Sequence, residues 1–276
     1  MRAAVIQINS DADVARNLER AETLVRAAAA DGAALIVLPE KWALLGAGDV
    51  IAAGAEPLDG PIVSAASRWA RELGIHLCAG SVPEEPDDGG KPYNTSVLID
   101  PEGEVTATYR KLHMFDVEVE GTEYRESEHE RAGEDLKTAT AGELELGLTV
   151  CYDLRFPELF RILALRGATA FTIPSAFTAV TGRAHWEVLL RARAVENAAF
   201  VIAAGQVGKA EPHYESWGHS MLVDPWGRVL EAIDEGEGHA CADLDMAELR
   251  RVRESLPSLA NRRDDAYEWP VEARVL

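Results

Sequence analysis

Short apolar stretches of strand length alternate with amphipathic helical patterns along most of this chain. Residues 3–8 (AAVIQI) are followed by a helical pattern over 11–32 and by a second apolar stretch over 33–40. An aspartate near the start of the helical pattern can cap a helix, and Gly32 can end it. This alternation predicts an α/β fold in which helices cover mixed sheets.

The alternation resumes in the second half of the chain. Helical patterns over 156–167 and 184–199 alternate with apolar stretches over 168–174 and 200–208. Residues 93–111 indicate a hairpin that turns at the sequence PEG. The predicted sheets should therefore contain antiparallel as well as parallel strand pairs.

The chain of 276 residues has no linker rich in glycine, proline or serine that would divide it. Its most irregular stretch, residues 116–137, is acidic and lies in the middle. We interpret this stretch as a loop over a site, because long loops inside a compact domain are usually functional. We therefore expect a single domain over residues 1–276.

The charge balance limits the classes of partner. Asp and Glu number 47 against 27 Lys and Arg, which gives a net charge of -20. A nucleic acid or an anionic membrane surface requires a basic footprint, so neither is expected as a partner. The N-terminal sequence lacks the pattern of a signal peptide, and the three cysteines include no CxxC pair. We expect a cytoplasmic protein without disulfide bonds.

Cys151 lies between an apolar stretch, residues 148–150, and the predicted first turn of a helix, residues 157–159. A nucleophilic thiol would suit this place, exposed at a bend and close to the amide donors of a helix start. The alternative is a half-buried cysteine of the core, since a free cysteine usually behaves as a small hydrophobic residue.

Three further reactive side chains also come next to apolar or strand-like stretches. Glu40 follows a predicted strand, Lys111 ends another, and Glu126 lies in the acidic stretch. Taken singly, each has an ordinary interpretation as a solvated charge.

Taken together, these side chains suit one reaction. A carboxylate can accept the proton of a thiol, and an ammonium group can stabilise the oxyanion that forms when the thiolate attacks a carbonyl. A second carboxylate can position the ammonium group. Such a set performs acyl transfer through a thioester.

The segments LPEKW, YRKLHMFD and CYDLRFPEL occur in this order and resemble the three signatures of the nitrilase superfamily of carbon–nitrogen hydrolases. The resemblance continues through residues 173–206, 218–230 and 250–267 and is strongest to the Nit-type branch of ω-amidases and deaminated glutathione amidases. The chain has Glu120 and Ala132 where relatives often carry proline, which affects loop shape and not the reactive groups.

The resemblance implies a fold, an assembly and residue roles. The expected fold is a four-layer α-β-β-α sandwich, paired into a homodimer. Glu40 is implied to be the general base, Lys111 the cation that stabilises the oxyanion, Cys151 the nucleophile and Glu126 the second glutamate. With the backbone N–H of Tyr152 as a further oxyanion donor, this set would hydrolyse an amide of a small acid with water, without any cofactor or metal.

Substrate-binding residues are expected close to the nucleophile. Arg155 can pair with a substrate carboxylate, although a structural role beside Asp153 or the acidic stretch is an equal alternative. Phe177, Thr178 and Thr181 are predicted to lie in a strand-to-helix loop at the same mouth. They would offer a ring and hydroxyl groups to a small amide.

Other functions stay open at this point. The nearest alternatives are an N-carbamoyl amino acid amidohydrolase and a nitrilase, and a different class is an interaction module without activity. A Cys–His pair with His113 or with His185, which is predicted to open a helix, is conceivable. A metal site is disfavoured because no HExxH motif occurs, and a redox sensor because no second cysteine is near Cys151 in sequence.

Overall fold

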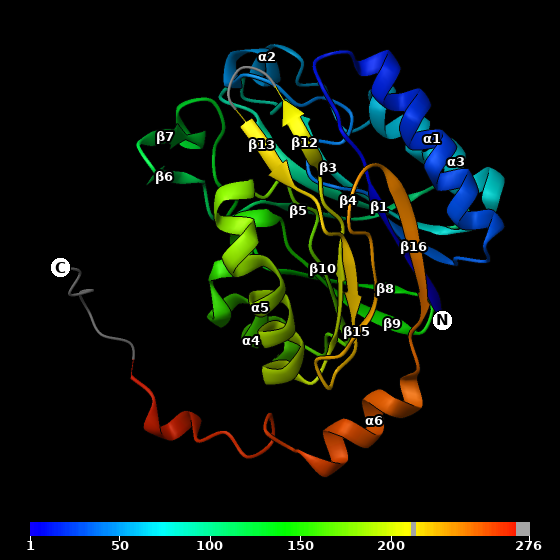
Figure 1. Ribbon diagram of the computed structural model, residues 1–276, viewed down its shortest axis with the longest axis vertical. Helices are drawn as coiled ribbons and strands as arrows, with labels where there is room; N and C mark the ends of the chain where they lie inside the picture. Colours follow the sequence, from blue (N-terminus) through cyan, green and yellow to red (C-terminus); the bar gives the residue numbers. More distant parts are fainter. Residues whose placement is uncertain (211–213, 269–276) are drawn as a thin grey trace.

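Two six-stranded sheets form the centre of the molecule (Figure 1). The structure is a computed structural model that describes residues 1–210 and 214–268. The first sheet has the order β16-β1-β2-β3-β4-β5. Its strands are β1 (Arg2–Gln7), β2 (Leu35–Val37), β3 (His76–Glu84), β4 (Tyr93–Ile99), β5 (Val105–Arg110) and β16 (Gly238–Asp243). The neighbours β1, β2 and β3 are parallel, and the other pairs are antiparallel.

The second sheet repeats this plan with the order β15-β14-β11-β10-β9-β8. Its strands are β8 (Lys137–Ala141), β9 (Leu144–Leu148), β10 (Ala170–Thr172), β11 (Phe200–Ala203), β14 (Met221–Val223) and β15 (Val229–Ala232). The neighbours β9, β10 and β11 are parallel, whereas the outer pairs are antiparallel. Two small hairpins complete the strands, β6 (Asp116–Val119) with β7 (Thr122–Arg125) and β12 (Val207–Ala210) with β13 (Tyr214–Trp217).

Successive side chains along a strand of the first sheet point to opposite faces and pack in two different hydrophobic clusters. Val5 and Val37 pack in the cluster shared with the second sheet, whereas Ile6 and Ile36 pack against helices on the outer face. Because side chains alternate along a strand, a strand that is buried on both faces is apolar throughout. This explains why β1 and β2 come from uninterrupted apolar stretches.

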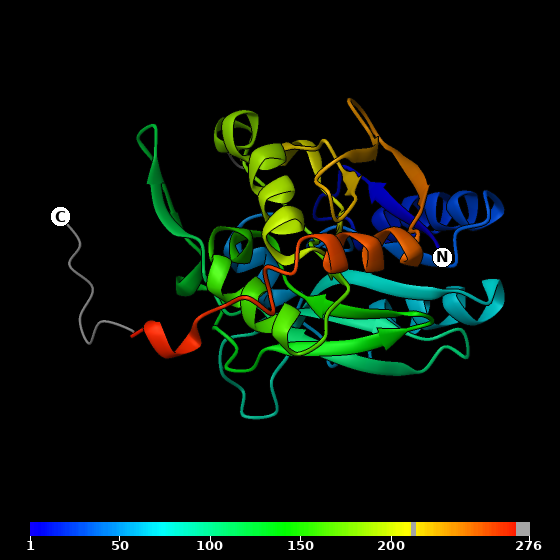
Figure 2. The same ribbon diagram turned by 90° about the horizontal axis from the view of Figure 1, so that it is seen from below.

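Helices cover the outer face of each sheet. Helices α1 (Val14–Ala30) and α3 (Pro61–Leu73) lie on one side of the two sheets, and α4 (Pro157–Leu165) and α5 (Ala179–Asn197) on the other (Figures 1 and 2). The α-β-β-α sandwich predicted from the sequence is therefore confirmed. The remaining described elements are two helices and three 3-10 turns: α2 (Gly48–Ala53), α6 (Met246–Ser255), η1 (Glu126–Glu128), η2 (Cys151–Arg155) and η3 (Asp264–Ala266).

Three local predictions are wrong. The acidic stretch lies beside a cavity, as a loop over a site would, but it is not irregular throughout, because it contains the β6–β7 hairpin, which projects from the body of the molecule (Figure 2). Residues 200–208 are not one strand, since β11 ends at Ala203 and β12 begins at Val207. Helix α5 begins at Ala179, so His185 does not open it. In the described part of the chain, no helix is both long and apolar enough to cross a membrane.

Candidate functional site

The three reactive residues predicted from the sequence follow the ends of three different strands. Glu40 comes after β2, Lys111 directly after β5, and Cys151 after β9. In sheets of this kind, the segments after the carboxyl ends of parallel strands converge on one edge. The fold thereby brings together side chains that are far apart in the sequence.

Cys151 begins the turn η2 with a left-handed backbone, at a φ of 48°. Its N–H donates to the carbonyl oxygen of Pro174 at 2.8 Å, which fixes it against the segment after β10. A non-glycine residue in this conformation is strained and is held there by its surroundings. The expectation of an exposed thiol is wrong, because only 7% of the residue is accessible to solvent.

Asp153 holds this turn in place from inside the protein. Its carboxylate is fully buried and accepts hydrogen bonds from the N–H of Val150 at 2.9 Å and from the hydroxyl of Tyr109 at 2.7 Å. It also lies 2.7 Å from Nδ1 of His113, whose ring stacks on Phe156. The sequence analysis missed this role, although an acid at the third position of a turn commonly bonds back to the N–H before it.

Glu40 is held by donors from three parts of the chain. Its Oε1 accepts from Nδ2 of Asn94 at 2.8 Å and from Nζ of Lys111 at 2.9 Å. Its Oε2 accepts from the N–H of Ala176 at 2.8 Å. The side chain is buried, and it lines the same cavity as Cys151. The carboxylate is therefore fixed beside the thiol.

Lys111 connects the two predicted carboxylates. Its Nζ lies 2.9 Å from Glu40 and 2.8 Å from Glu126, and its side chain is only 2% exposed. Burial disfavours the charge of this ammonium group, but the carboxylates of Glu126 and Glu40 outweigh burial and raise the pKa of Lys111 well above its usual value. The interpretation of Lys111 as a solvated strand end is thus excluded.

The thiol and the second glutamate respond differently to the same environment. Burial, followed by the negative charge of Glu40, raises the pKa of Cys151 well above its usual value. Burial alone would also raise the pKa of Glu126, but Lys111 and Lys41 hold it well below the usual range. At neutral pH the site therefore holds a neutral thiol, a charged Lys111 and an ionised Glu126.

Two charged residues of the site were not predicted from the sequence. Nζ of Lys41 lies 2.9 Å from Glu130 and 3.3 Å from Glu126, and all three side chains are at most 10% exposed. Lys41 directly follows Glu40, a signal that could have been used. Glu130 could not be distinguished by pattern from the other acids of its stretch.

A cavity of about 500 Å³ opens onto these groups. It is lined by Glu40, Lys111, Glu126 and Cys151 together with residues of the segment before α2 and of the β6–β7 hairpin. A carboxylate, an ammonium group and a thiol thus face one space large enough for a small molecule.

Three of the four predicted substrate-binding residues lie around a second, narrow space. A cavity of about 10 Å³ is lined by Cys151, Tyr152, Phe177, Thr178 and Thr181, with Phe115 and Ala176. Thr178 precedes α5, whereas Thr181 already lies in its first turn.

Arg155 lines neither cavity. Its guanidinium group lies over the ring of Phe177, 5.0 Å from the centroid, and bonds to Nδ1 of His185 at 3.2 Å. Neither His185 nor His113 lines the large cavity, and His113 is engaged with Asp153. The geometry therefore does not pair either histidine with the thiol of Cys151.

Comparison with known proteins gives consistent results. The sequence model of the family described as "Carbon-nitrogen hydrolase" matches residues 2–254. The chain is 39% identical over 267 residues to the omega-amidase NIT2 of Danio rerio, covering 96% of both chains. It is 43% identical over 278 residues to the deaminated glutathione amidase of Mus musculus, covering 96% of this chain and 84% of that protein.

One solved structure is similar in fold over most of the chain. It is a variant of the amidase from Nesterenkonia sp. AN1, which carries the acetamide moiety of fluoroacetamide added covalently at its active-site cysteine. The TM-score is 0.80 at 27% sequence identity, with 96% of this chain and 94% of that chain covered.

Proposed function

This chain belongs to the carbon–nitrogen hydrolase family, and we propose that Glu40, Lys111 and Cys151, with Glu126, are its catalytic residues. The family resemblance and the class of enzyme predicted from the sequence, an amidase that cleaves a C–N bond, are thereby confirmed. The observation that supports the residue roles best is the position of Lys111, whose Nζ joins two buried carboxylates at the wall that also holds the thiol.

The first half of the proposed reaction forms a thioester. As Sγ of Cys151 attacks the amide carbonyl, its proton passes to Glu40, because the raised pKa of Cys151 leaves little free thiolate at neutral pH. The carbonyl oxygen becomes an oxyanion next to Lys111 and the N–H of Tyr152. The C–N bond then breaks, the nitrogen takes the proton from Glu40, and ammonia or an amine leaves.

The second half releases the acid. Water occupies the place of the amine and gives a proton to Glu40 while its oxygen attacks the thioester carbonyl. The C–S bond breaks, and the proton returns to the sulfur of Cys151. Glu126 keeps the ammonium group of Lys111 in place in both halves and balances its charge in the buried site.

We further propose that the substrate is a linear monoamide of a small carboxylic acid, of the ω-amide or deaminated-glutathione type. This proposal is supported by the two relatives named for such activities, each matching 96% of this chain. The amide end would lie at Cys151 in the large cavity, close to Phe177, Thr178 and Thr181, which line the narrow space together with Cys151. Arg155 would contribute to substrate binding indirectly, by holding the ring of Phe177 that its guanidinium group covers.

A screen for ammonia release tests the function. Short ω-amides, N-carbamoyl amino acids and nitriles are compared at equal concentration, with Cys151→Ala as the blank. Release from the ω-amides by the wild-type chain alone supports the proposal. A preference for a carbamoyl compound or a nitrile would replace the substrate class, and no release from any compound would favour an interaction module.

We also propose that residues 1–276 form one hydrolase domain that acts in the cytoplasm as a homodimer. The family match over residues 2–254 supports a single unit. Three exposed apolar side chains lie on or beside α5 and offer a surface on which a second copy can pack: Val188, Val195 and Trp226. Light scattering coupled to gel filtration tests the dimer, and Val188→Glu should shift it towards the monomer.

A further inference from the structure

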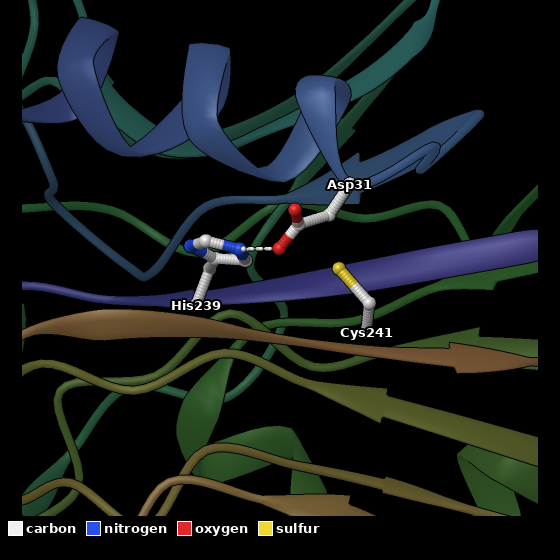
Figure 3. Close-up of side chains that lie close together, drawn as sticks. All are labelled: Asp31, His239 and Cys241. Atoms are coloured by element: carbon white, nitrogen blue, oxygen red, sulfur yellow. Dashed lines mark hydrogen bonds and ion pairs between the residues drawn. The ribbon is translucent and has the colours of Figure 1, made fainter.

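A second cluster of reactive side chains lies apart from the residues that line the catalytic cavity. Asp31 caps the end of α1, and His239 and Cys241 come from β16 (Figure 3). Their donor atoms, one from each residue, all lie within 4.8 Å of one another. None of the three lines the cavity that contains Cys151.

The backbone sets this arrangement. His239 and Cys241 are two positions apart on β16, so their side chains project from the same face of the strand. The strand is held in register by β1, where Ala4 pairs with Cys241 and Ile6 with His239. Both positions are therefore rigid. The strand β16 lies at the end of its sheet, and solvent reaches the cluster through the exposed Asp31, whereas His239 and Cys241 are half-buried.

Asp31 completes the cluster from the helix side. Its Oδ2 lies 2.8 Å from Nε2 of His239, and the thiol of Cys241 points towards the pair (Figure 3). The main-chain oxygen of Asp31 accepts a hydrogen bond from Nε of Arg2 at 3.0 Å. The residue is thus anchored through its backbone while 61% of its side chain stays accessible and able to rotate.

We propose that Asp31, His239 and Cys241 form a binding site for a divalent transition-metal ion, with Zn²⁺ as the best match. A carboxylate oxygen, an imidazole nitrogen and a thiolate sulfur are the three donor types that Zn²⁺ takes in proteins. Ca²⁺ and Mg²⁺ prefer oxygen donors alone, so they do not fit this set. Water from the open side would supply the fourth ligand.

The charges of the loaded site balance. The ion takes the place of the proton between Nε2 of His239 and Asp31, the imidazole stays neutral with its proton on Nδ1, and the thiol proton of Cys241 passes to solvent. A thiolate and a carboxylate then neutralise the two charges of the ion. Burial raises the pKa of Cys241, Arg2 opposes the rise, and Asp31 and Glu231 add to it, so the ion must displace the thiol proton. A site without net charge avoids repulsion between the bound ion and the guanidinium group of Arg2.

The geometry requires only a small adjustment. Metal–ligand distances of about 2.0–2.3 Å place tetrahedral donors roughly 3.5 Å apart. The donors here lie within 4.8 Å, so rotation of the Asp31 and Cys241 side chains about their own bonds closes the gap. The ion would then join the end of α1 to β16 and stabilise the folded chain, because it binds the native state.

Cobalt substitution tests the site directly. The reduced, full-length protein is titrated with Co²⁺, and absorption from the thiolate–cobalt bond is recorded for the wild type and for Cys241→Ser, His239→Gln and Asp31→Asn. Displacement of Co²⁺ by Zn²⁺ then gives the zinc affinity. Cys151→Ser serves as the matched control, because it removes the thiol that lines the large cavity and leaves Cys241 in place.

We expect the cobalt band in the wild type and in Cys151→Ser, its loss in Cys241→Ser, and Zn²⁺ affinity at least about tenfold weaker in His239→Gln. Zn²⁺ should also raise the melting temperature of the wild type but not of Cys241→Ser. No band in the wild type, or a band that survives in Cys241→Ser and disappears in Cys151→Ser, would overturn the proposal. Melting curves without metal show whether each variant is folded.

Discussion

Lys41 and Glu130 form a buried ion pair on the wall of the large cavity that Cys151 also lines, with Nζ 2.9 Å from the carboxylate. Burial raises the pKa of Glu130 to about 7, with Lys41 opposing the rise and Glu126 adding to it. Glu130 therefore changes its charge close to neutral pH, beside a space that is proposed to receive an anionic amide. The charge of this wall depends on pH even though no part of the reaction uses Glu130.

Glu130→Gln should lower the KM of a carboxylate-bearing amide at pH 8 and leave it nearly constant between pH 6 and 8. In the wild type, loss of the Glu130 proton over this range adds a negative charge that repels such a substrate, so KM should rise with pH. Glu128→Gln is the matched control, since Glu128 also lines the cavity but is exposed to solvent. Equal pH profiles in all three proteins would contradict the prediction.

The same substitution should change how stability depends on pH. The folded pKa of Glu130 lies above its unfolded value, so this group stabilises the fold below about pH 4.5 and loses that contribution as pH rises through about 7. Relative to Glu130→Gln, the free energy of unfolding of the wild type should fall by about 3 kcal/mol across this window. Urea unfolding of both proteins at pH 5 and pH 8 measures the difference.

The sequence could predict the features that depend on the pattern of neighbouring residues or on a family motif. Strands buried on both faces are apolar throughout, so β1, β2 and the four-layer plan could be expected. The roles of three residues could be proposed because each lies in a segment that resembles a family signature: Glu40, Lys111 and Cys151. Solvent exposure could not be foreseen: the thiol of Cys151 is buried by segments far away in sequence, and Asp153 gains its role only from Tyr109 and Val150.

Cys151→Ala should abolish turnover while the protein stays folded. The substitution removes one sulfur next to an existing cavity, so its cost in stability should be no more than about 1–2 kcal/mol. Cys78→Ala should behave in the opposite way, with activity kept and stability lowered, because Cys78 is fully buried between the sheets. Kinetics and thermal unfolding of the two variants separate the roles, and clear hydrolysis by Cys151→Ala would refute the mechanism.

Glu40→Gln should stop turnover yet leave Cys151 reactive towards iodoacetamide. The amide cannot accept the thiol proton, so both halves of the reaction lose their base. The negative charge of Glu40 is also one of the causes that raise the pKa of Cys151, so its removal should make thiolate more accessible. Mass spectrometry of the alkylated protein measures labelling at Cys151. Turnover at the wild-type rate would show that Glu40 is not the base.

Lys111→Met should lower kcat by about a hundredfold or more, because a donor to the oxyanion acts mainly in the transition state. It also leaves the buried Glu40 without its ion-pair partner and Glu126 with Lys41 alone, so stability should fall by about 3–5 kcal/mol. Lys111→Arg keeps the charge and separates the two effects. We expect it to recover most of the stability but little of kcat, whereas recovery of both would show that a positive charge at this position is sufficient and that the ammonium group itself is not required.

The preference among substrates is the most specific prediction. We expect ω-amides of short keto or dicarboxylic acids to be hydrolysed at least about tenfold more efficiently than matched N-carbamoyl amino acids, a difference of roughly 1.4 kcal/mol in transition-state binding. In an ω-amide the carbonyl carries one nitrogen, whereas in a carbamoyl group a second nitrogen donates electrons to the carbonyl and weakens attack by Cys151. The ratio of kcat/KM for pairs of equal length measures the preference.

Lys41→Met tests where the acid end of the ω-amide lies. The variant should bring the ratio of kcat/KM closer to one only if the ammonium group of Lys41 contacts that acid end. An unchanged ratio would place the acid end elsewhere along the cavity. A ratio inverted in the wild type would make the enzyme a carbamoyl hydrolase with the same Glu40, Lys111 and Cys151.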